Sequence, residues 1–270
     1  MTDWNAIATT VEAITTEVGA KLLQDFGQVQ ASEKADGSLV TRSDQWADNR
    51  LREAIAQAFP DHGILSEEGD QTFPDREWCW IIDPLDGTTN YTRGLPLWSI
   101  SLGLLYQGVP VFGLIDVPPL RQTFQGVWIG ASGLPGTSRA RLNHQPIQTT
   151  PDDPSSNHFF NLCARSTAVM KQPFPCKIRM LGSASYNLLM VAAGVAVGGV
   201  EATPKIWDIA AVWAIVHAAG GTWVALDNQP VFPLQPGENY RDRSYPTLVV
   251  SRAELVDRFQ PLVGFLANKA

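Results

Sequence analysis

The sequence of 270 residues contains few cysteines and few histidines. Its three cysteines, Cys79, Cys163 and Cys176, are odd in number and form no Cys-x-x-Cys pair, so we expect neither a disulfide framework nor a structural zinc site. The four histidines show no metal-ligand spacing either. The lack of a disulfide framework is typical of a reducing compartment, and we therefore expect the protein in the cytoplasm.

Long apolar runs and an excess of basic residues are also missing. The most apolar stretch, residues 188–200, contains three glycines and is too short to cross a bilayer, and the first residues lack the basic and apolar regions of a signal peptide. Acidic residues outnumber basic ones by 27 to 20, and the net charge of −7 gives no electrostatic reason to bind nucleic acid. We expect a soluble protein that binds neither membranes nor nucleic acid.

Several common catalytic motifs are absent as well. The sequence has no Gly-x-Ser-x-Gly, no Walker A lysine motif and no Gly-x-Gly-x-x-Gly fingerprint, which argues against the most frequent hydrolase, nucleotide and dinucleotide sites. It also lacks the twelve-residue ligand pattern of an EF-hand. A domain that binds Ca²⁺ only for structure is therefore a poor alternative.

The sequence does contain a regular succession of helical and strand patterns. Apolar residues at three- and four-residue steps from Ile7 to Leu22 predict an opening helix that ends near Gly27. Similar patterns predict helices at residues 41–58, 183–193 and 208–219, and strands at residues 78–82, 98–106, 109–117, 159–163 and 197–201. Successive strands predict a mixed or antiparallel sheet in the first half, and alternating strands and helices predict α/β architecture in the second.

Residues 130–157 separate these two patterns. They are rich in Gly, Pro, Ser, Asn and Asp and have weak periodicity, which predicts a crossing between two halves of the chain. The length and the hydrophobic content of 44% are sufficient for a sizeable core. We therefore expect an α/β (α+β) fold in which residues 1–145 carry the main motif and residues 146–270 complete the site.

The main motif is residues 83–89, Asp-Pro-Leu-Asp-Gly-Thr-Thr, at the end of a predicted buried strand. Pro84 fixes its own φ and biases Asp83 toward extended geometry, so the two aspartates are held at a defined separation while the Leu85 carbonyl can point inward. Two carboxylates and a carbonyl form a hard-oxygen site suited to Mg²⁺. Gly87 and Thr88 would open a short helix whose free N–H groups attract phosphate. The alternative for a single Asp-Pro or Asp-Gly is an ordinary turn.

Further acidic residues lie near predicted element ends. Glu67 and Glu68 follow the apolar residues 64–65, as at a strand end, although such a pair alone is usually on the surface. Asp208 lies where a carboxylate would cap the first turn of a helix, and a capping carboxylate can still face a cation with its second oxygen. Glu201 is either a surface acid or a ligand for a substrate hydroxyl.

Together, Glu67-Glu68, residues 83–89 with Pro96, and Trp207-Asp208 with Gly220-Gly221 resemble the two signature regions of the inositol monophosphatase family. The match spans nearly the whole chain, and the string Asp-Pro-Leu-Asp-Gly-Thr-Thr-Asn is highly specific. The resemblance implies a layered α/β/α/β/α sandwich and the Mg²⁺-dependent hydrolysis of small phosphomonoesters by a metal-activated water. It also implies a homodimer, because members of this family often dimerise.

The resemblance further implies roles for individual residues. Two or three Mg²⁺ ions, for which Mn²⁺ could substitute and with which Ca²⁺ and Li⁺ would interfere, would be bound by Glu67, Asp83, the Leu85 carbonyl, Asp86 and Asp208. Thr88, paired with Asp44 and helped by Glu67, would activate the attacking water. The substrate would contact Leu85, Asp86, Gly87 and Thr88 on the phosphate side, and Gly182, Ser183, Ala184, Glu201 and Asp208 on the alcohol side. Lys34 would belong to a mobile loop, and residues 34–38 are expected to be partly disordered without cations.

Two positions depart from the family pattern. Many relatives carry an Asp four residues before Glu201 and an aromatic residue immediately before it, where this chain has Val197 and Val200, so we expect the alcohol side to differ. Thr89-Asn90-Tyr91 is similar to the inositol and sugar phosphatase branch. We therefore expect myo-inositol monophosphate as the substrate, with histidinol phosphate and fructose 1,6-bisphosphate as alternatives. A regulatory relative without catalysis is a weaker alternative, because every mapped catalytic position keeps a competent side chain.

Overall fold

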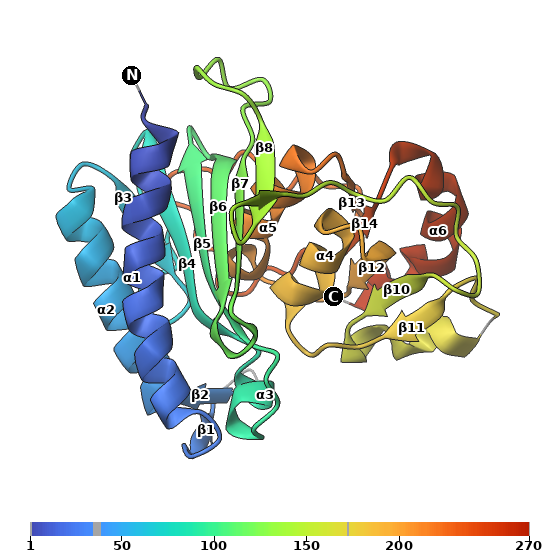
Figure 1. The fold of residues 1–270 in the computed structure, drawn as a ribbon, viewed down its shortest axis with the longest axis horizontal. Helices are drawn as coiled ribbons and strands as arrows, with labels where there is room; N and C mark the ends of the chain where they lie inside the picture. The colour runs from blue at the N-terminus through green and yellow to red at the C-terminus, as the bar shows by residue number, and fades with distance from the viewer. Residues whose placement is uncertain (1, 35–38, 172, 270) are drawn as a thin grey trace.

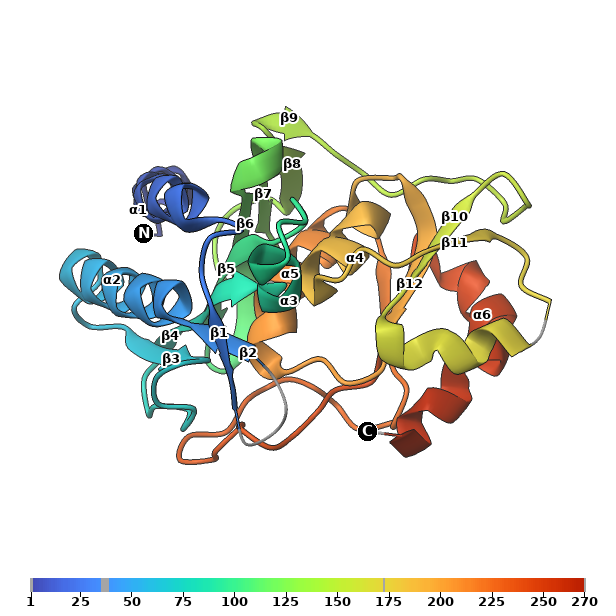
Figure 2. The ribbon, with the colours of Figure 1, turned by 90° about the horizontal axis from the view of Figure 1, so that it is seen from below.

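The computed structural model describes residues 2–34, 39–171 and 173–269, which form five layers. Helices α1 (Trp4–Asp25) and α2 (Arg42–Ala58) cover the outer face of a seven-stranded sheet. Helices α4 (Ala184–Ala192) and α5 (Ile206–Ala218) lie between this sheet and a five-stranded sheet, and α6 (Val256–Val263) covers the far side (Figures 1 and 2). The predicted α/β/α/β/α sandwich is confirmed. None of the described helices is both long and apolar enough to cross a membrane.

The seven-stranded sheet is mixed, as predicted. Its strands lie in chain order: β3 (Gly63–Ser66), β4 (Trp78–Asp86), β5 (Ser99–Tyr106), β6 (Val109–Val117), β7 (Gln122–Val127), β8 (Arg139–Leu142) and β9 (Gln145–Pro146). Only β3 and β4 pair in parallel, and each later neighbour pair is antiparallel. Strand β4 runs four residues past its predicted end, because Asp83 and Asp86 still pair with Ser101 and Ser99 of β5 across an irregularity. The motif therefore lies within a strand whose pairing is interrupted at Pro84.

The five-stranded sheet combines parallel and antiparallel pairs. Its spatial order is β11 (Lys177–Arg179), β10 (Phe159–Leu162), β12 (Ala196–Glu201), β14 (Thr247–Val250) and β13 (Thr222–Ala225). The remaining elements are the pair β1 (Ala31–Glu33) and β2 (Leu39–Thr41), the short helix α3 (Thr88–Thr92), and 3-10 helices at Pro118–Leu120, Ala164–Lys171, Ala253–Leu255 and Gly264–Lys269.

The predicted crossing at residues 130–157 is partly wrong. Strands β8 and β9 lie within that range and still belong to the first sheet, so the chain crosses to the second sheet between Pro146 and Phe159. Short edge strands next to glycines and prolines leave no clear period in the sequence. The division into an N-terminal half of residues 1–145 and a C-terminal half of residues 146–270 stays a prediction. Helix α5 from the second half packs on β5, β6 and β7 of the first sheet.

Three glycines bring α5 into direct contact with the first sheet. Gly103, Gly113 and Gly126 are cross-strand neighbours on β5, β6 and β7, so they form one row across the sheet. A Cβ atom on Gly113 would lie 2.2 Å from the carbonyl oxygen of Ala211 in α5, and one on Gly126 would lie 2.5 Å from the Cα of Ile215. No side chain fits between this row and the helix, and the position of α5 is therefore set by backbone contact.

The histidine of α5 is enclosed by aromatic rings. His217 stacks on Trp128 at 4.8 Å between ring centroids and contacts Trp213 at 4.6 Å. Its Nε2 atom is buried and has no hydrogen-bond partner within the described part of the chain. Burial lowers the pKa of His217 to about 4, because the charged imidazolium would lose its hydration.

This histidine should make stability depend on pH. In the unfolded chain His217 binds a proton near pH 6.5, whereas the folded protein keeps it neutral down to about pH 4. The unfolded state therefore binds more protons between these values, and the free energy of unfolding should fall as the pH falls from about 6.5 to 4. Urea titrations of wild type and His217→Gln across this window should give a smaller slope for the variant. The exposed His144→Gln variant is the control, and equal slopes for wild type and His217→Gln would contradict the prediction.

Candidate active site

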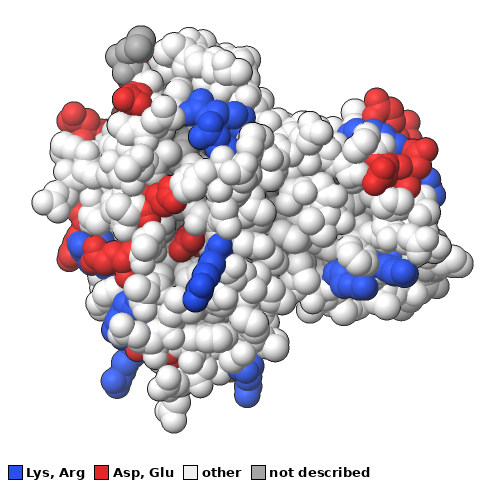
Figure 3. All heavy atoms as spheres, viewed as in Figure 1, with Lys and Arg blue, Asp and Glu red and all other residues white. Residues whose placement is uncertain are grey.

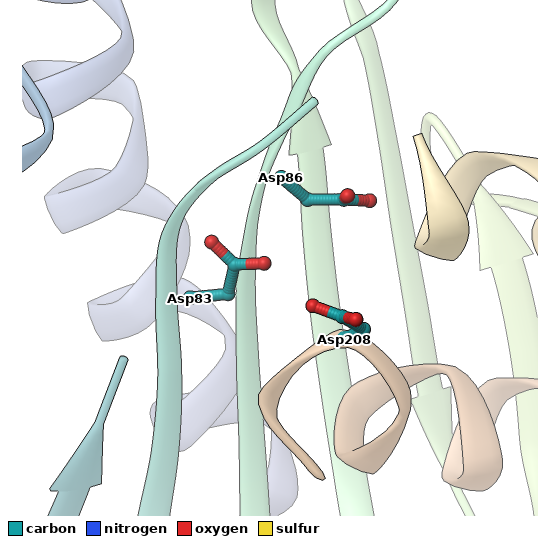
Figure 4. A group of neighbouring side chains, drawn as sticks. All are labelled: Asp83, Asp86 and Asp208. Atoms are coloured by element: carbon teal, nitrogen blue, oxygen red, sulfur yellow. The ribbon is translucent and has the colours of Figure 1, made fainter. Parts of the chain in front are cut away.

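Three aspartates from two distant parts of the chain meet between the two sheets. Asp83 and Asp86 come from β4, and Asp208 comes from the first turn of α5. One carboxylate oxygen from each lies within 4.8 Å of the others, and Figure 4 shows the three side chains converging on one point. The structure thus confirms that the main motif and Asp208 are spatial neighbours.

Each of these carboxylates is fixed by nearby donors. The backbone N–H of Leu85 donates to Asp83 Oδ1 at 2.9 Å, and that of Lys205 donates to Asp208 Oδ2 at 2.8 Å. Lys205 is the N-cap of α5, so the helix begins two residues earlier than predicted. Asp208 is the third residue of the helix, and its side chain accepts from the backbone of the N-cap residue. Both bonds leave a second oxygen available to a cation.

Asp86 is held by the first turn of α4. The Ser183 hydroxyl donates to Asp86 Oδ2 at 2.6 Å, the Ser185 N–H donates to the same oxygen at 2.8 Å, and the Ser185 hydroxyl is a third donor to it. The Ala184 N–H donates to Oδ1 at 3.1 Å. A helix N-terminus suits a carboxylate, because its free N–H groups carry partial positive charge.

The electrostatics of the group favour a bound cation. Burial raises the pKa of Asp83 well above its ordinary value, and the neighbouring charges of Glu67, Asp86 and Asp208 add to this effect. Removal from water and the charge of Asp86 likewise raise the pKa of Asp208. Close carboxylates of this kind stay ionised together only when a positive charge lies between them. Their hard oxygen donors suit Mg²⁺ or Ca²⁺ better than a soft metal.

The predicted Thr88–Asp44 pair is present beside this group. The Thr88 hydroxyl lies 3.1 Å from both Asp44 Oδ1 and the Leu85 carbonyl, and it can donate to one of them at a time. Asp44 Oδ2 accepts from the Thr41 N–H at 2.8 Å, in the capping box that begins α2. Gly87 precedes α3 with φ at +93°, a conformation that favours glycine. Leu85, Gly87, Thr88 and the three aspartates line one cavity, and Asp44 is connected to it through Thr88.

That cavity has a volume of about 370 Å³. Its lining comprises Glu67, Asp83, Leu85, Asp86, Gly87, Thr88, Arg165, Thr203, Lys205, Trp207, Asp208 and Ser244. It thus contains every residue predicted to bind metal. The volume suits a small polar ligand rather than a macromolecule.

Glu67 lies in the cavity but not within the group of three aspartates. Its Oε1 atom lies 3.0 Å from the Lys34 ammonium, which also contacts Glu68. Burial outweighs the attraction of Lys34 and raises the pKa of Glu67 to about 7. Lys34 therefore contacts a residue of the cavity lining, and its place in a mobile loop stays a prediction. Residues 35–38, for which we expected disorder, lie outside the described residues.

A second cavity of about 260 Å³ adjoins the first through Asp86 and Asp208. Gly182, Ser183, Ala184 and Glu201, all predicted to contact the alcohol, line it. Asn187 donates to Glu201 Oε1 at 2.7 Å, and burial raises the pKa of Glu201 well above its ordinary value. The Ser183 hydroxyl and the Ala184 N–H point to Asp86, so they support the metal group as well as lining this cavity.

The two valines that depart from the family pattern do not line either cavity. Val197 and Val200 are buried in the core between the second sheet and α6. Val200 alternates with Glu201 and so faces away from it, whereas Val197 lies at an irregularity in the pairing of β12 with β10 and packs in the same core as Val200. The expectation that these two positions alter the alcohol side finds no support in the lining of the cavities.

Sequence reasoning missed several residues of the site. Ser185 binds Asp86, Asn187 orients Glu201, and Arg165 lines both cavities while its Nη1 atom donates to the Thr203 hydroxyl at 2.6 Å. The Ser-Ala-Ser string at the start of α4 is a capping pattern that could have indicated Ser185. Asn187 and Arg165 follow no motif, because only the packing of distant segments brings them to the cavities.

Comparisons with known proteins agree with this geometry. Residues 3–254 match the inositol monophosphatase family. The chain is 35% identical to the inositol-1-monophosphatase of Synechocystis sp. over 84% of this chain and 80% of that protein. It is 32% identical to the fructose-1,6-bisphosphatase/inositol-1-monophosphatase of Aquifex aeolicus over 77% of this chain and 81% of that protein. It is 30% identical to the histidinol-phosphatase of Chlorobaculum parvum over 76% of this chain and 80% of that protein.

Solved structures give the same result for the fold. The inositol monophosphatase (IMPase) of Thermotoga maritima superposes with a TM-score of 0.80 and 27% identity, covering 98% of this chain and 99% of that one. The family match over most of the chain, the relatives of 30% identity or more and the convergent aspartates all agree. The chain therefore belongs to the inositol monophosphatase family of phosphatases.

Proposed function

We propose that this phosphatase hydrolyses myo-inositol monophosphate and uses Mg²⁺. The observation that carries the proposal is the junction of two cavities at Asp86 and Asp208, one lined by the carboxylate group and the other by Glu201. A phosphate group beside the first cavity leaves the second for a polyhydroxylated alcohol. The relative from Synechocystis, named as an inositol-1-monophosphatase, supports the same choice of substrate.

Residues on the carboxylate side would hold the cations. We assign this role to Glu67, Asp83, the Leu85 carbonyl, Asp86 and Asp208, all of which line the cavity of about 370 Å³. Bound there, Mg²⁺ would lower the pKa of a water molecule and neutralise phosphoryl oxygens. Without a cation, burial and mutual repulsion raise the pKa values of Asp83 and Asp208. The charge of Mg²⁺ would compensate this repulsion, which supports the assignment.

The other residues of the site would orient the reactants. We assign Thr88 the task of holding the attacking water, with Asp44 accepting the proton of the Thr88 hydroxyl and Glu67 assisting. The backbone N–H groups of Gly87 and Thr88 would bind the phosphate at the start of α3. Glu201, fixed by Asn187, would accept a hydrogen bond from a hydroxyl of the alcohol. The 3.1 Å contacts of Thr88 make its hydroxyl the most directly testable of these assignments.

Removal of that hydroxyl should slow hydrolysis. We expect Thr88→Ala to lower kcat by about 10²-fold, the usual size of a positioned proton-transfer group, with a smaller effect on KM. Steady-state kinetics with myo-inositol 1-phosphate provide the measurement. Thr88→Ser keeps the hydroxyl and should retain most of the activity, while the exposed Thr89→Ala is the matched control. A Thr88→Ala enzyme as active as Thr89→Ala would contradict the assignment.

A substrate panel tests the proposed alcohol. Phosphate release should be measured with Mg²⁺ on myo-inositol 1-phosphate, histidinol phosphate and fructose 1,6-bisphosphate. We expect kcat/KM for the inositol ester to be about tenfold higher than for either alternative, a difference of about 1.4 kcal/mol in transition-state binding. Higher kcat/KM with histidinol phosphate or the bisphosphate would overturn the inositol assignment and leave phosphatase chemistry intact. Replacement by Mn²⁺, inhibition by Ca²⁺ and Li⁺, the homodimer and the cytoplasmic location stay predictions.

A further inference from the structure

A third cavity, separate from the site, lies between α1 and the edge of the first sheet. It has a volume of about 300 Å³ and shares no lining residue with the two cavities described above. Its lining comprises Asn5, Ala8, Thr9, Glu12, Phe112, Gln125, Gly126, Val127, Arg139, Arg141 and His144. Cavities of this size hold small molecules.

The sheet itself explains why this space is open. Helix α1 packs against β6 and α2, while β7 and β8 extend beyond it (Figures 1 and 2). Gln125 pairs with Arg141, and Val127 pairs with Arg139, so these four side chains project from one face of the sheet. The intervening Ala140 packs into the core on the opposite face. Two arginines therefore stand side by side on the floor of a groove whose wall is α1.

The charges in this groove are unbalanced. Arg139 donates to the neutral amide oxygen of Asn5 at 3.1 Å. Among the residues that the structure describes, Arg141 makes no side-chain hydrogen bond or ion pair, although its side chain is half-buried. The carboxylate that lines the groove, Glu12, already accepts from Gln125 at 2.8 Å and lies 3.3 Å from His144 Nε2. The groove is thus positive in a chain whose net charge is −7. Figure 3 shows basic side chains gathered on this face over β8.

We propose that this groove binds a small metabolite with phosphate or carboxylate groups, at a site distinct from the active site. A guanidinium group forms paired hydrogen bonds with either kind of oxyanion, and Arg139 and Arg141 present two such groups at alternate positions of one strand, on the same face. Phe112 and Val127 supply an apolar surface for a short carbon skeleton. The amide of Asn5 supplies a further hydrogen-bonding group at the edge of the groove.

Calorimetric titration with citrate and with inorganic phosphate tests this site. The protein is freed of metal on a chelating resin and titrated at low ionic strength, because the active site then has no cation to hold an anion and Arg141 is not screened by salt. We expect saturable binding of at least one probe with one site per chain. Arg141→Gln and Arg139→Gln should each weaken binding about tenfold, since each removes a charged donor pair.

The control is Arg121→Gln, which removes the same charge from an exposed position outside the groove. It should change the affinity less than twofold. A crystal soaked with citrate should show the anion between Arg139 and Arg141. The inference is overturned if neither probe binds, if Arg121→Gln weakens binding as much as Arg141→Gln, or if the anion lies elsewhere in the crystal. Activity on phosphomonoesters remains intact in each of these outcomes, so they leave the proposed function untouched.

Discussion

Replacing Asp83 by Asn is expected to lower kcat/KM by about 10³-fold while the protein stays folded. The amide oxygen of asparagine can still accept from the Leu85 N–H, which lies 2.9 Å from Asp83 Oδ1, so the local backbone keeps its hydrogen bond. The negative charge is lost, and with it a ligand that a divalent cation requires. Steady-state phosphate release as a function of Mg²⁺ concentration gives the measurement, and the Mg²⁺ concentration for half-maximal activity should rise.

Asp116→Asn is the matched control for this variant. Asp116 is also a buried carboxylate of the first sheet, but it lies on β6, accepts from the Thr123 hydroxyl at 2.9 Å and lines neither cavity of the site. We expect Asp116→Asn to keep wild-type activity. Thermal unfolding should show that Asp83→Asn is folded before its activity is compared. Wild-type activity of folded Asp83→Asn at saturating Mg²⁺ would exclude the proposed ligand set.

Adding one methyl group to the glycine row should destabilise the whole protein. In Gly113→Ala the new Cβ would lie 2.2 Å from the Ala211 carbonyl oxygen, a distance at which α5 must move away from the sheet. Overpacking of this kind costs about 3 kcal/mol in the free energy of unfolding. Because α5 carries Asp208, the shift should also weaken the affinity for Mg²⁺. Urea unfolding monitored by circular dichroism measures the first effect, and Mg²⁺ titration of the activity measures the second.

Gly264→Ala provides the comparison for this methyl group. A Cβ atom at Gly264 meets no atom within 4 Å, and its φ of −58° is accessible to alanine. We expect a change of less than about 0.5 kcal/mol for that variant, as for other surface substitutions. Equal urea midpoints for Gly113→Ala and Gly264→Ala would contradict the conclusion that backbone contact with the sheet sets the position of α5.

The sequence predicts most elements that have a clear period. The opening helix, the hairpin of β5 and β6 and the helix that becomes α4 are confirmed within a few residues, because their apolar spacing depends on local geometry. Strands β8 and β9 could not be recognised, since they are short edge strands among glycines and prolines. Strand β8 depends on pairing with β7, which lies more than ten residues earlier, and β9 depends in turn on pairing with β8.

The site shows the same division between local and tertiary information. Asp83, Leu85 and Asp86 are identified by one contiguous motif, and Asp208 by its place at a helix start. Packing between the two sheets determines that Arg165 reaches both cavities and that Val197 and Val200 reach neither. Such facts depend on which face of an element is turned inward, and a short strand such as β12 gives no local signal for that choice.

The hydrogen bonds around Asp86 limit how that residue can bind cations. A carboxylate has about four lone-pair positions, two on each oxygen. Oδ2 already accepts from the Ser183 hydroxyl and from both the N–H and the hydroxyl of Ser185, whereas Oδ1 accepts only from the Ala184 N–H. Oδ1 is therefore the oxygen through which Asp86 would bind a cation, since Oδ2 is already surrounded by donors. The first turn of α4 thus selects which oxygen of Asp86 faces the site.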